Sequence, residues 1–241
     1  MNVQKILDDK SQSWSIFDKK VSKSYDLVSD LISLRLYRTW CRGLARALPK
    51  REHLQVLDLA SGTGIIPLTS LAEHPTAGHH FTCVDLSEEM LNIFRDKVKG
   101  TAVETSLDIR HGDATALEFD EGRFDAVTMA CGIRNVGDTA AGLSEILRVL
   151  KPGGAVYFLE PSIPKSTFLK WVFLTYFRYI VPAIAGLFST ASAYKYFNQS
   201  VEHFPYGEAF IKMIEEAGFT QCSIQKFAFG AGALYVGHKP S

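Results

Sequence analysis

The sequence predicts an α/β fold built around a mostly parallel sheet. Between residues 54 and 160, short apolar runs typical of buried strands alternate with longer stretches typical of helices, and this βαβ repetition indicates a parallel sheet. Three of the predicted strands are followed by an acid or by a pair of glycines. Because parallel strands end at one edge of a sheet, these residues should meet there, where open α/β sheets bind their ligands.

The elements are expected in the following order. The first half should contain helices over residues 26–48, 65–73 and 87–98 and strands over 54–59 and 81–85, with a third strand near residue 107. The second half should contain a strand over 124–130, a helix over 140–150, a Lys-Pro-Gly-Gly turn at 151–154 and a strand over 155–160. After a helix C-cap at Gly218, two alternating runs over 221–229 and 233–238, separated by a Gly-Ala-Gly at 230–232, predict a hairpin at the edge of the sheet.

The glycine loop after the first strand is the most informative motif. The strand carries Asp58 near its end and runs into Gly62-Thr63-Gly64, a pattern that lets the backbone approach a nucleotide-like ligand at the start of a helix. A dinucleotide fingerprint has a third glycine at the position of Pro67, and proline suits a first helical turn rather than close packing around a pyrophosphate. The loop therefore favours a ligand without phosphates, such as S-adenosylmethionine, over NAD. An ordinary strand-to-helix turn is the alternative.

Two further acids lie at predicted strand ends. Asp85 follows the second strand, about 20 residues after Gly64, where a carboxylate binds the ribose hydroxyls of a nucleoside. A helix N-cap, a role that Ser87 can equally fill, is the alternative. Asp113 follows the third strand in a Gly-Asp-Ala segment. It is placed to accept a hydrogen bond from an adenine amino group, or it faces water in a loop.

Composition limits the class of protein. The 241 residues, 46% hydrophobic and 22% charged, are ordinary for one globular enzyme domain. The 26 basic residues balance the 26 acidic ones, so no nucleic-acid partner is expected. The four cysteines are scattered, so we expect neither a metal site nor a disulfide framework, and a cytoplasmic location. Residues 1–20 lack the apolar core of a secretory signal.

One apolar stretch interrupts the pattern. Residues 168–188 are apolar and aromatic, but they contain Lys170, Arg178 and Pro182. An arginine near the centre of a transmembrane helix costs about 3 kcal/mol to insert, which argues against a membrane span. The stretch is expected either to pack on the core as a helix or to form the apolar wall of an acceptor pocket that rests on a membrane surface.

Four segments of the chain resemble the UbiE/MenG C-methyltransferases of ubiquinone and menaquinone biosynthesis. They are the glycine loop at 58–64, residues 132–136 (Gly-Ile-Arg-Asn-Val), residues 147–154 (Leu-Arg-Val-Leu-Lys-Pro-Gly-Gly) and residues 194–201 (Tyr-Lys-Tyr-Phe-Asn-Gln-Ser-Val). The first and third are shared by many S-adenosylmethionine-dependent enzymes, whereas the second and fourth are narrower and point to the quinone branch. The resemblance runs from about residue 17 to residue 239.

The resemblance implies a Rossmann-like class I methyltransferase fold, with a mostly parallel seven-stranded sheet, a C-terminal antiparallel hairpin and helices on both faces. It implies one domain, with an N-terminal helical cap at 1–50, a cofactor-binding core at 51–160, an acceptor-pocket insertion at 161–206 and a C-terminal helix and hairpin at 207–241. The candidate residues for binding S-adenosylmethionine are then Asp58, Gly62, Thr63, Gly64, Asp85, Leu86, Asp113, Ala114, Ala130 and Cys131.

Departures from the family pattern fall where the acceptor is expected. Family members read Ser-x-Gly-x-His-Arg-x-Trp where this chain has residues 33–40, with Arg35 in place of glycine and Tyr37 in place of histidine. The family's Leu-Glu-Phe-Ser-x-Pro appears at 159–164 with Pro161 in place of phenylalanine. These departures leave cofactor use untouched. They leave open a specialised quinone, or another prenylated or polyketide ring, as the acceptor.

Methyl transfer to a ring carbon sets the demands on the site. The sulfonium methyl transfers by in-line displacement, so the enzyme must hold an electron-rich carbon about 3 to 3.5 Å from it and exclude water. Ionising a hydroquinone hydroxyl makes the neighbouring ring carbon nucleophilic, and the ring proton leaves afterwards. Arg134 is the candidate for stabilising that phenolate, although it cannot be an ordinary base. A structural salt bridge between its loop and a helix is the alternative.

Three further residues are candidates for the acceptor site. Tyr25, in a Tyr-Asp pair that matches the family, can cap the pocket or hydrogen-bond a ring oxygen, or it packs as an aromatic at the surface. His203 belongs to the residue type that most often serves as a general base, and Tyr194 is a similar candidate. A structural role is the alternative for both.

The sequence thus predicts an S-adenosylmethionine-dependent C-methyltransferase, cytoplasmic or peripheral to a membrane. Its acceptor should be the ring of a demethylated isoprenoid quinol, either demethylmenaquinol or the demethylated ubiquinol precursor, and homodimer formation is left open. A methyltransferase for another lipophilic or secondary-metabolite acceptor is the nearest alternative. A protein of the same fold that binds without turnover, as a scaffold, is the second.

Overall fold

The computed structural model describes residues 19–181 and 191–241, and the side chains of residues 25–181 and 196–241. Its centre is a seven-stranded sheet with the order β3-β2-β1-β4-β5-β7-β6. The strands are β1 (Gln55–Leu59), β2 (His80–Asp85), β3 (Leu107–His111), β4 (Phe124–Ala130), β5 (Leu150–Pro161), β6 (Thr220–Phe227) and β7 (Gly232–His238). Strands β1 to β5 are parallel to one another, and β7 is antiparallel to β5 and β6. The predicted parallel sheet and C-terminal hairpin are confirmed.

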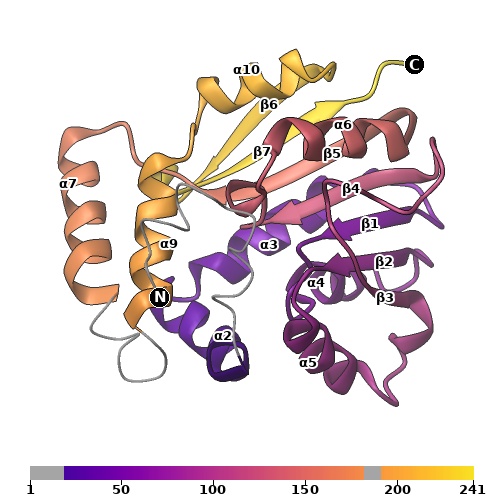
Figure 1. Cartoon of the computed structure of the whole chain (residues 1–241), viewed down its shortest axis with the longest axis horizontal. Coiled ribbons are helices and arrows are strands. Elements are labelled where there is room, and N and C mark those ends of the chain that lie inside the picture. Colours follow the sequence, from indigo (N-terminus) through magenta and orange to yellow (C-terminus); the bar gives the residue numbers. More distant parts are fainter. Residues whose placement is uncertain (1–18, 182–190) are drawn as a thin grey trace.

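Helices cover both faces of this sheet (Figure 1). One face packs against α3 (Leu36–Ala47), α4 (Ile65–Glu73) and α5 (Glu88–Val98), and the other packs against α6 (Thr139–Val149) and α10 (Glu208–Glu216). Strands β1, β2 and β4 are therefore buried along nearly their whole length. This explains why they are almost continuously apolar rather than alternating.

Three more helices gather at the left in Figure 1, beyond the carboxyl ends of the parallel strands. They are α2 (Lys19–Ile32), α7 (Thr167–Thr175) and α9 (Ala191–His203). A π-helical turn, η4 (Tyr176–Ile180), continues α7. The remaining short turns are η2 (Glu104–Ser106), η3 (Ile133–Asn135) and η5 (Ala228–Gly230). The predicted ligand-binding edge of the sheet thus faces a layer of helices.

The prediction of one helix over residues 26–48 is wrong at its centre. Helix α2 ends at Ile32 and α3 begins at Leu36, and between them Leu34 and Arg35 have φ angles of 49° and 62°. Left-handed conformations are unfavourable for residues with a Cβ. Neither residue is a glycine or a proline, so the sequence carries no ordinary signal for the break. The break allows α2 to pack against α5 as well as α3.

The predicted turn at residues 151–154 lies inside a strand instead. Strand β5 pairs Leu150 with Phe124 and Ala155 with Ala126, so the residues between them bulge out of the ladder. Gly153 has a φ angle of 72° there, a conformation that glycine adopts without steric cost. The Lys-Pro-Gly-Gly motif is therefore a bulge within β5.

The described part of the apolar stretch at 168–188 forms most of α7 and all of η4, and its residues 182–188 lie outside the described part of the chain. None of the side chains of α7 or η4 is fully buried. The helix therefore lies at the surface of the molecule, with its inner side chains half-buried and its outer ones exposed. No helix in the described residues is long and apolar enough to cross a membrane.

Candidate active site

The glycine loop between β1 and α4 combines an open position with a crowded one. Gly62 has a φ angle of 53°, and a Cβ added to it would meet no atom within 4 Å. Gly64 has a φ angle of 83° and caps α4, and a Cβ there would lie 2.2 Å from the ring of Phe94. Gly62 thus leaves the backbone open to a ligand, whereas Gly64 allows α5 to pack against the loop.

Asp85 at the end of β2 holds the glycine loop in place. One carboxylate oxygen accepts a hydrogen bond of 2.8 Å from the backbone N–H of Gly62, and the other accepts one of 2.8 Å from Ser87. The cap of α5 is Ser87, whose hydroxyl accepts a hydrogen bond from the N–H of Met90. Asp85 is therefore not the cap, and it lies beside the open position at Gly62.

Asp58 on β1 is a buried carboxylate with one unsatisfied oxygen. Its side chain belongs to a residue only 1% exposed, and Oδ1 accepts a hydrogen bond of 2.6 Å from the hydroxyl of Thr128 on β4. Oδ2 has no hydrogen-bond partner within the described residues. Burial raises the pKa of this carboxyl to about 7, although the Thr128 hydroxyl opposes the shift. A buried acceptor of this kind is costly unless a ligand satisfies it.

The remaining predicted cofactor residues lie at the same edge of the sheet. Asp113 is exposed just beyond β3, and its Oδ1 accepts hydrogen bonds of 2.8 Å from the N–H and the hydroxyl of Thr115. Leu86 follows β2 and is half-buried. Ala114 and Ala130 pack against the core clusters on opposite faces of the sheet. The parallel strands thus bring together the residues that the sequence placed in one site.

An ion pair ties α2 to the glycine loop, which the sequence did not predict. The hydroxyl of Thr63 donates a hydrogen bond of 2.5 Å to Asp26 on α2. Lys97 on α5 forms an ion pair with the other oxygen of Asp26 and donates a hydrogen bond of 3.0 Å to the carbonyl of Thr63. Three segments that are distant in the sequence therefore meet at one residue of the loop.

A cavity of about 360 Å³ lies between the sheet edge and the helical layer. Its walls come from α2, the turn after it, α3, η3, α7, η4, α9 and η5, and most of them are aliphatic or aromatic. Polar groups reach it from Tyr25, Tyr37, Cys131, Arg134 and Tyr196, among others. Ligand pockets typically have this size and an apolar lining with a few polar groups.

Among the described residues that line this cavity, Arg134 on η3 is the only charged one. It is 3% exposed, and its Nη1 forms an ion pair of 2.7 Å with Glu160 on β5, a residue that is fully buried. Its Nε donates a hydrogen bond of 3.3 Å to Ser200 on α9. Burial opposes the charge of the guanidinium, but the Glu160 carboxylate outweighs it and raises the pKa of Arg134 above its ordinary range.

The partner of Arg134 escaped the sequence analysis. The predicted alternative was a salt bridge from its loop to a helix, whereas the ion pair joins it to the neighbouring strand β5. Glu160 lies in the segment that resembles the family motif, but nothing in its local pattern shows what it pairs with. The position of Glu160 at the end of a buried strand was the one available signal.

Burial acts on the pKa of two further polar groups of the cavity, Tyr37 and Cys131. Burial raises the pKa of Tyr37 well above its usual value. Burial also raises the pKa of the Cys131 thiol to about 11, although nearby Arg134 opposes the shift. Cys131 itself follows β4 with a φ angle of 54° and lines this cavity. This predicted cofactor residue therefore reaches the cavity as well as the edge of the sheet.

Of the two remaining predicted catalytic residues, one lies away from the cavity and the side chain of the other is not described. His203 is exposed near the end of α9, where its Nδ1 lies 2.8 Å from the carbonyl oxygen of Gln199, and it does not line the cavity. Tyr194 belongs to α9, but its side chain lies outside the described residues. Tyr196 lines the cavity, and its hydroxyl donates a hydrogen bond of 3.0 Å to Asn135.

Solved structures share this architecture. A structure from Methanococcus maripaludis, assigned to the S-adenosylmethionine-dependent methyltransferases, superposes with a TM-score of 0.68 at 20% identity and covers 93% of this chain and 94% of that one. Phosphoethanolamine N-methyltransferase 2 from Haemonchus contortus, in complex with S-adenosylmethionine, has a TM-score of 0.60 at 18% identity and covers 82% and 51%. These similarities show the class I methyltransferase fold.

Sequence comparison is more specific. The ubiE/COQ5 methyltransferase family matches residues 4–239. Ubiquinone/menaquinone biosynthesis C-methyltransferase UbiE from Geobacter sulfurreducens is 38% identical over 91% of this chain and 85% of that protein. Demethylmenaquinone methyltransferase from Chlorobaculum tepidum is 37% identical over 93% and 91%. The chain therefore belongs to the ubiE/COQ5 methyltransferase family and is an S-adenosylmethionine-dependent methyltransferase.

Proposed function

We propose that this enzyme transfers a methyl group from S-adenosylmethionine to a ring carbon of a demethylated isoprenoid quinol. The observation that carries the proposal is the buried guanidinium of Arg134 in the wall of an otherwise uncharged, largely apolar cavity. A lipophilic ring suits such walls, and a ring oxygen that becomes anionic suits the guanidinium. The names of the similar proteins from G. sulfurreducens and C. tepidum support this class of acceptor.

The residues of the glycine loop fit S-adenosylmethionine. The unpartnered Oδ2 of Asp58 suits the ammonium of its methionine part, Gly62 leaves the backbone open, and Asp85 beside it suits the ribose hydroxyls. When bound, S-adenosylmethionine supplies an electrophilic methyl group. We assign further contacts to residues at the same edge of the sheet, namely Thr63, Gly64, Leu86, Asp113, Ala114, Ala130 and Cys131.

Arg134 activates the acceptor in this proposal. A guanidinium held by Glu160 and Ser200 has a fixed direction, so it stabilises a quinol oxygen that loses its proton without having to reorganise. The resulting phenolate makes the neighbouring ring carbon electron-rich. Because Arg134 stays protonated, it does not itself accept the proton. Its part is to hold the anionic oxygen.

Tyr25 lines the cavity from α2, next to Asp26, which is bonded to the glycine loop. This places the phenol between the acceptor cavity and the loop, where it can hydrogen-bond the second ring oxygen or a water that takes up a proton. Closure by α2 also keeps bulk water away from the reacting carbon. We assign no catalytic role to His203, because it lies outside the cavity.

The partners follow from this acceptor. An isoprenoid quinol resides in a membrane, so we propose that the enzyme, itself without a spanning helix in its described residues, works at a membrane surface. A cytoplasmic location and a homodimer stay predictions.

A second acceptor class is favoured by one observation. Tyr37, which replaces the histidine of the family pattern, lines the cavity itself, and Pro161, which replaces phenylalanine, lines it as well. The two departures therefore change the shape and the polar groups of the acceptor site. Another prenylated or polyketide ring is the second candidate on this ground.

Labelled S-adenosylmethionine tests both candidates. The protein is incubated with methyl-labelled cofactor and with demethylmenaquinol or the demethylated ubiquinol precursor, and the ring carbons are analysed by mass spectrometry. Label in either quinol supports the proposal and identifies the ring. No label in either quinol, with binding confirmed by calorimetry, overturns it in favour of the second acceptor class or a non-catalytic scaffold. Asp85→Ala should abolish both binding and turnover if the protein is an enzyme.

A further inference from the structure

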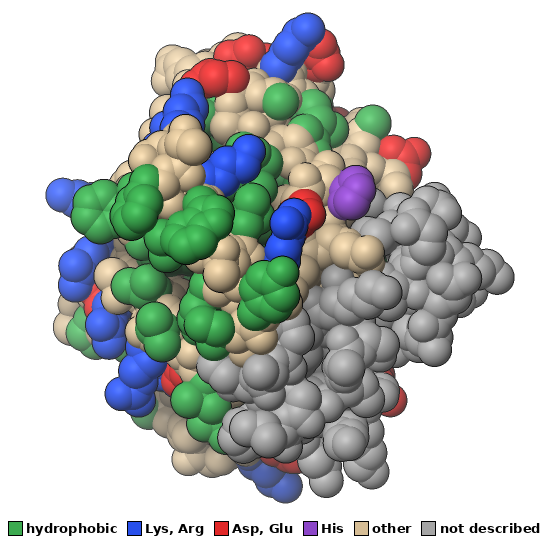
Figure 2. Space-filling view, turned by 90° about the vertical axis from the view of Figure 1, so that its left-hand side faces the viewer, with side chains coloured by type: hydrophobic (Ala, Val, Ile, Leu, Met, Phe, Trp, Pro, Cys, Tyr) green, Lys and Arg blue, Asp and Glu red, His purple; other side chains and the backbone are tan. Residues whose placement is uncertain are grey.

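The exposed large hydrophobic side chains of the described residues are concentrated around the mouth of the cavity. They come from three segments only: α2 with the turn that leads into the first residue of α3, α7 with η4, and η5. They are Leu27, Leu31, Leu34, Leu36, Phe168, Trp171, Val172, Tyr179, Ile180 and Phe229. Figure 2 shows hydrophobic side chains gathered on the side of the molecule that carries α7. An apolar surface of this extent is unusual on a protein that meets only water.

Four of these side chains are shared by the cavity and the outer surface. Leu34, Leu36, Val172 and Phe229 line the cavity and are exposed to solvent at the same time. The cavity therefore opens onto the apolar surface rather than onto a polar one. A ligand with a long apolar tail can leave the cavity there without crossing a polar rim.

The backbone at two points of this mouth is held in unfavourable conformations. Leu34 and Arg35 have φ angles of 49° and 62° on one side, and Ala228 and Phe229 have φ angles of 45° and 57° on the other. Phe229 is nevertheless 88% exposed. Strain of this kind persists where the surrounding structure imposes it, and it often marks a functional position. The large apolar side chain of each pair, Leu34 or Phe229, is exposed to water, so its burial does not offset the strain.

Positive charge surrounds the same mouth. Segments 31–38, 165–180 and 226–229 contain six cations and no carboxylate, although the chain as a whole is neutral. Arg38 pairs with Asp30 and Arg178 with Glu202, whereas no ion pair of the described residues involves the other four. The six cations are Arg35, Arg38, Lys165, Lys170, Arg178 and Lys226. In Figure 2, basic side chains flank the hydrophobic ones.

We propose that this mouth is the docking face for an anionic lipid bilayer, with α7, the α2–α3 turn and η5 in contact with the leaflet. The proposal rests on the proposed function, because it assumes a lipid acceptor whose tail stays in the bilayer. Apolar side chains enter the interface, and the basic residues around them meet lipid phosphates. Docking in this orientation brings the acceptor ring into the cavity directly from the membrane.

Charge argues against a second copy of the chain as the occupant. A twofold dimer through this face would be isologous, so it would place the same six cations of each copy opposite those of the other. Like charges brought together at an interface oppose association. An anionic surface satisfies the same cations. Such a dimer would also close the mouth of the cavity against its ligand.

The test uses the full chain and vesicles of phosphatidylcholine with or without phosphatidylglycerol. The variant Phe168→Ser/Trp171→Ser removes two side chains that are 69% and 65% exposed and do not line the cavity. Lys170→Glu reverses one charge of the face, and Lys50→Glu, before β1 at the other end of the sheet, is its matched control. Binding is measured by cosedimentation. Methylation is measured both with a tail-less demethylated quinol in solution and with a long-tailed one in vesicles.

Wild type and Lys50→Glu should bind anionic vesicles. The double variant and Lys170→Glu should lose about tenfold or more in vesicle affinity and in methylation of the long-tailed quinol, but not of the tail-less one. Equal vesicle binding by wild type and both face variants would overturn the docking proposal, as would a wild-type dimer that the double variant converts to monomers. Failure of the proposed function is distinct: wild type would then methylate neither quinol, whether or not it binds vesicles.

Discussion

At the scale of single residues, the site depends on two buried charges that need partners. Arg134 has Glu160 within the protein, whereas Oδ2 of Asp58 has none among the described residues. The charge of Arg134 is paired before any ligand binds, whereas we expect the carboxylate of Asp58 to be paired by a cationic group of the ligand. Substitutions at the two positions should therefore have different signatures.

Two substitutions of Arg134 should separate its effect on folding from its effect on the methylation rate. Arg134→Ala leaves the Glu160 carboxylate buried without its partner, which costs about 3 to 5 kcal/mol of folding free energy. Arg134→Lys keeps the positive charge but loses the planar, two-pronged geometry. We expect Arg134→Lys to fold, to bind S-adenosylmethionine as the wild type does, and to lose about 10- to 100-fold in kcat. Urea unfolding, calorimetry and single-turnover methylation measure the three quantities. Wild-type kcat in Arg134→Lys would remove this residue from the mechanism.

Asp58 should make cofactor binding depend on pH. Its pKa is about 7 in the unliganded protein, and only the carboxylate form pairs with an ammonium, so binding releases a proton below that pH. The affinity for S-adenosylmethionine should rise by up to about tenfold per pH unit towards pH 7 and level off above it. Since the folded state holds this proton more tightly than the unfolded state, the unliganded protein should lose stability as the pH rises from about 4 to about 7.

Calorimetry between about pH 5.5 and 8.5 measures the first trend, and urea unfolding between about pH 4 and 8 measures the second. Asp58→Asn should bind the cofactor weakly at every pH and should lack the pH dependence. If Asp58→Asn and the wild type show the same pH profile, the dependence belongs to another group.

At the scale of elements, short irregular segments position the site more than the regular ones do. The glycine loop, the turn between α2 and α3, and η5 all contain residues with positive φ. The Asp26–Lys97 ion pair and the hydrogen bond from Thr63 then fasten α2 to the glycine loop. Helices and strands supply the frame, and these segments determine where the backbone meets a ligand.

Alanine substitutions at the two glycines of the loop should affect different properties, namely stability at Gly64 and cofactor affinity at Gly62. Gly64→Ala forces a Cβ against the ring of Phe94 at a positive φ, so we expect a loss of about 2 to 4 kcal/mol in folding free energy. Gly62→Ala meets open space and should cost about 1 kcal/mol. Because that space is the proposed ligand position, Gly62→Ala should instead lose cofactor affinity. Urea unfolding and calorimetry on the pair decide this, and equal stability losses would contradict it.

The strained turn after α2 should be relieved by glycine. Arg35→Gly removes the Cβ from a residue with a φ angle of 62°, which should raise stability by about 1 kcal/mol, or about 2 to 4 °C in Tm. Arg42→Gly, in the regular part of α3, is the matched control and should lower stability by a similar amount. Differential scanning calorimetry measures both. A lower Tm for Arg35→Gly would mean that the Arg35 side chain makes a stabilising contact that outweighs the strain.

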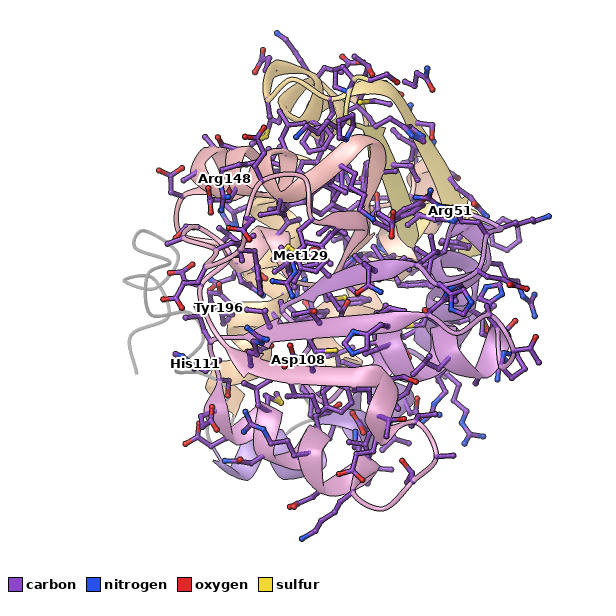
Figure 3. The ribbon with its side chains drawn as sticks, turned by 90° about the vertical axis from the view of Figure 1, so that its right-hand side faces the viewer. Arg51, Asp108, His111, Met129, Arg148 and Tyr196 are labelled. Atoms are coloured by element: carbon purple, nitrogen blue, oxygen red, sulfur yellow. The ribbon has the colours of Figure 1, made fainter. Side chains whose placement is uncertain are left out.

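At the scale of the whole molecule, two opposite sides carry different kinds of side chain. Figure 3 shows the side opposite to Figure 2, where labelled polar and charged residues such as Arg51, Asp108 and His111 lie among many nitrogen- and oxygen-tipped side chains. The apolar and basic mouth of the cavity lies on the other side. Although the chain as a whole is neutral, the mouth of the cavity therefore carries an excess of positive charge.

Added salt should weaken the binding of this basic mouth to anionic vesicles. The Debye length falls from about 10 Å at 0.1 M to about 3 Å at 1 M ionic strength, so attraction between the basic mouth and anionic vesicles should weaken on adding salt. We expect methylation of a long-tailed quinol in anionic vesicles to fall several-fold, while methylation of a tail-less quinol in solution changes little. Rate measurements at several salt concentrations test this. An equal response of both substrates would mean that salt acts on the chemistry instead.

The sequence was sufficient for the sheet and for its ligand edge, because both depend on local patterns. The apolar strands, the glycine loop and the acid at position 85 are visible within a few residues, and the structure confirms the strands and the helix over 65–73. The pairing of Arg134 with Glu160 and the contact of Asp26 with Thr63 join residues far apart in the chain. No periodicity encodes such contacts. The break at Leu34 and Arg35 was missed because its residues are not turn formers.

The position of β7 between β5 and β6 has a consequence for biosynthesis. Strand β5 is completed at Pro161, but its neighbour on that side is β7, which begins only at Gly232. While the chain emerges from the ribosome, the edge of β5 therefore stays unpaired until the intervening helices and β6 have also been made. Unpaired edges of apolar strands are sites of aggregation. During that interval, we expect a chaperone or the neighbouring helices to cover the unpaired edge of β5.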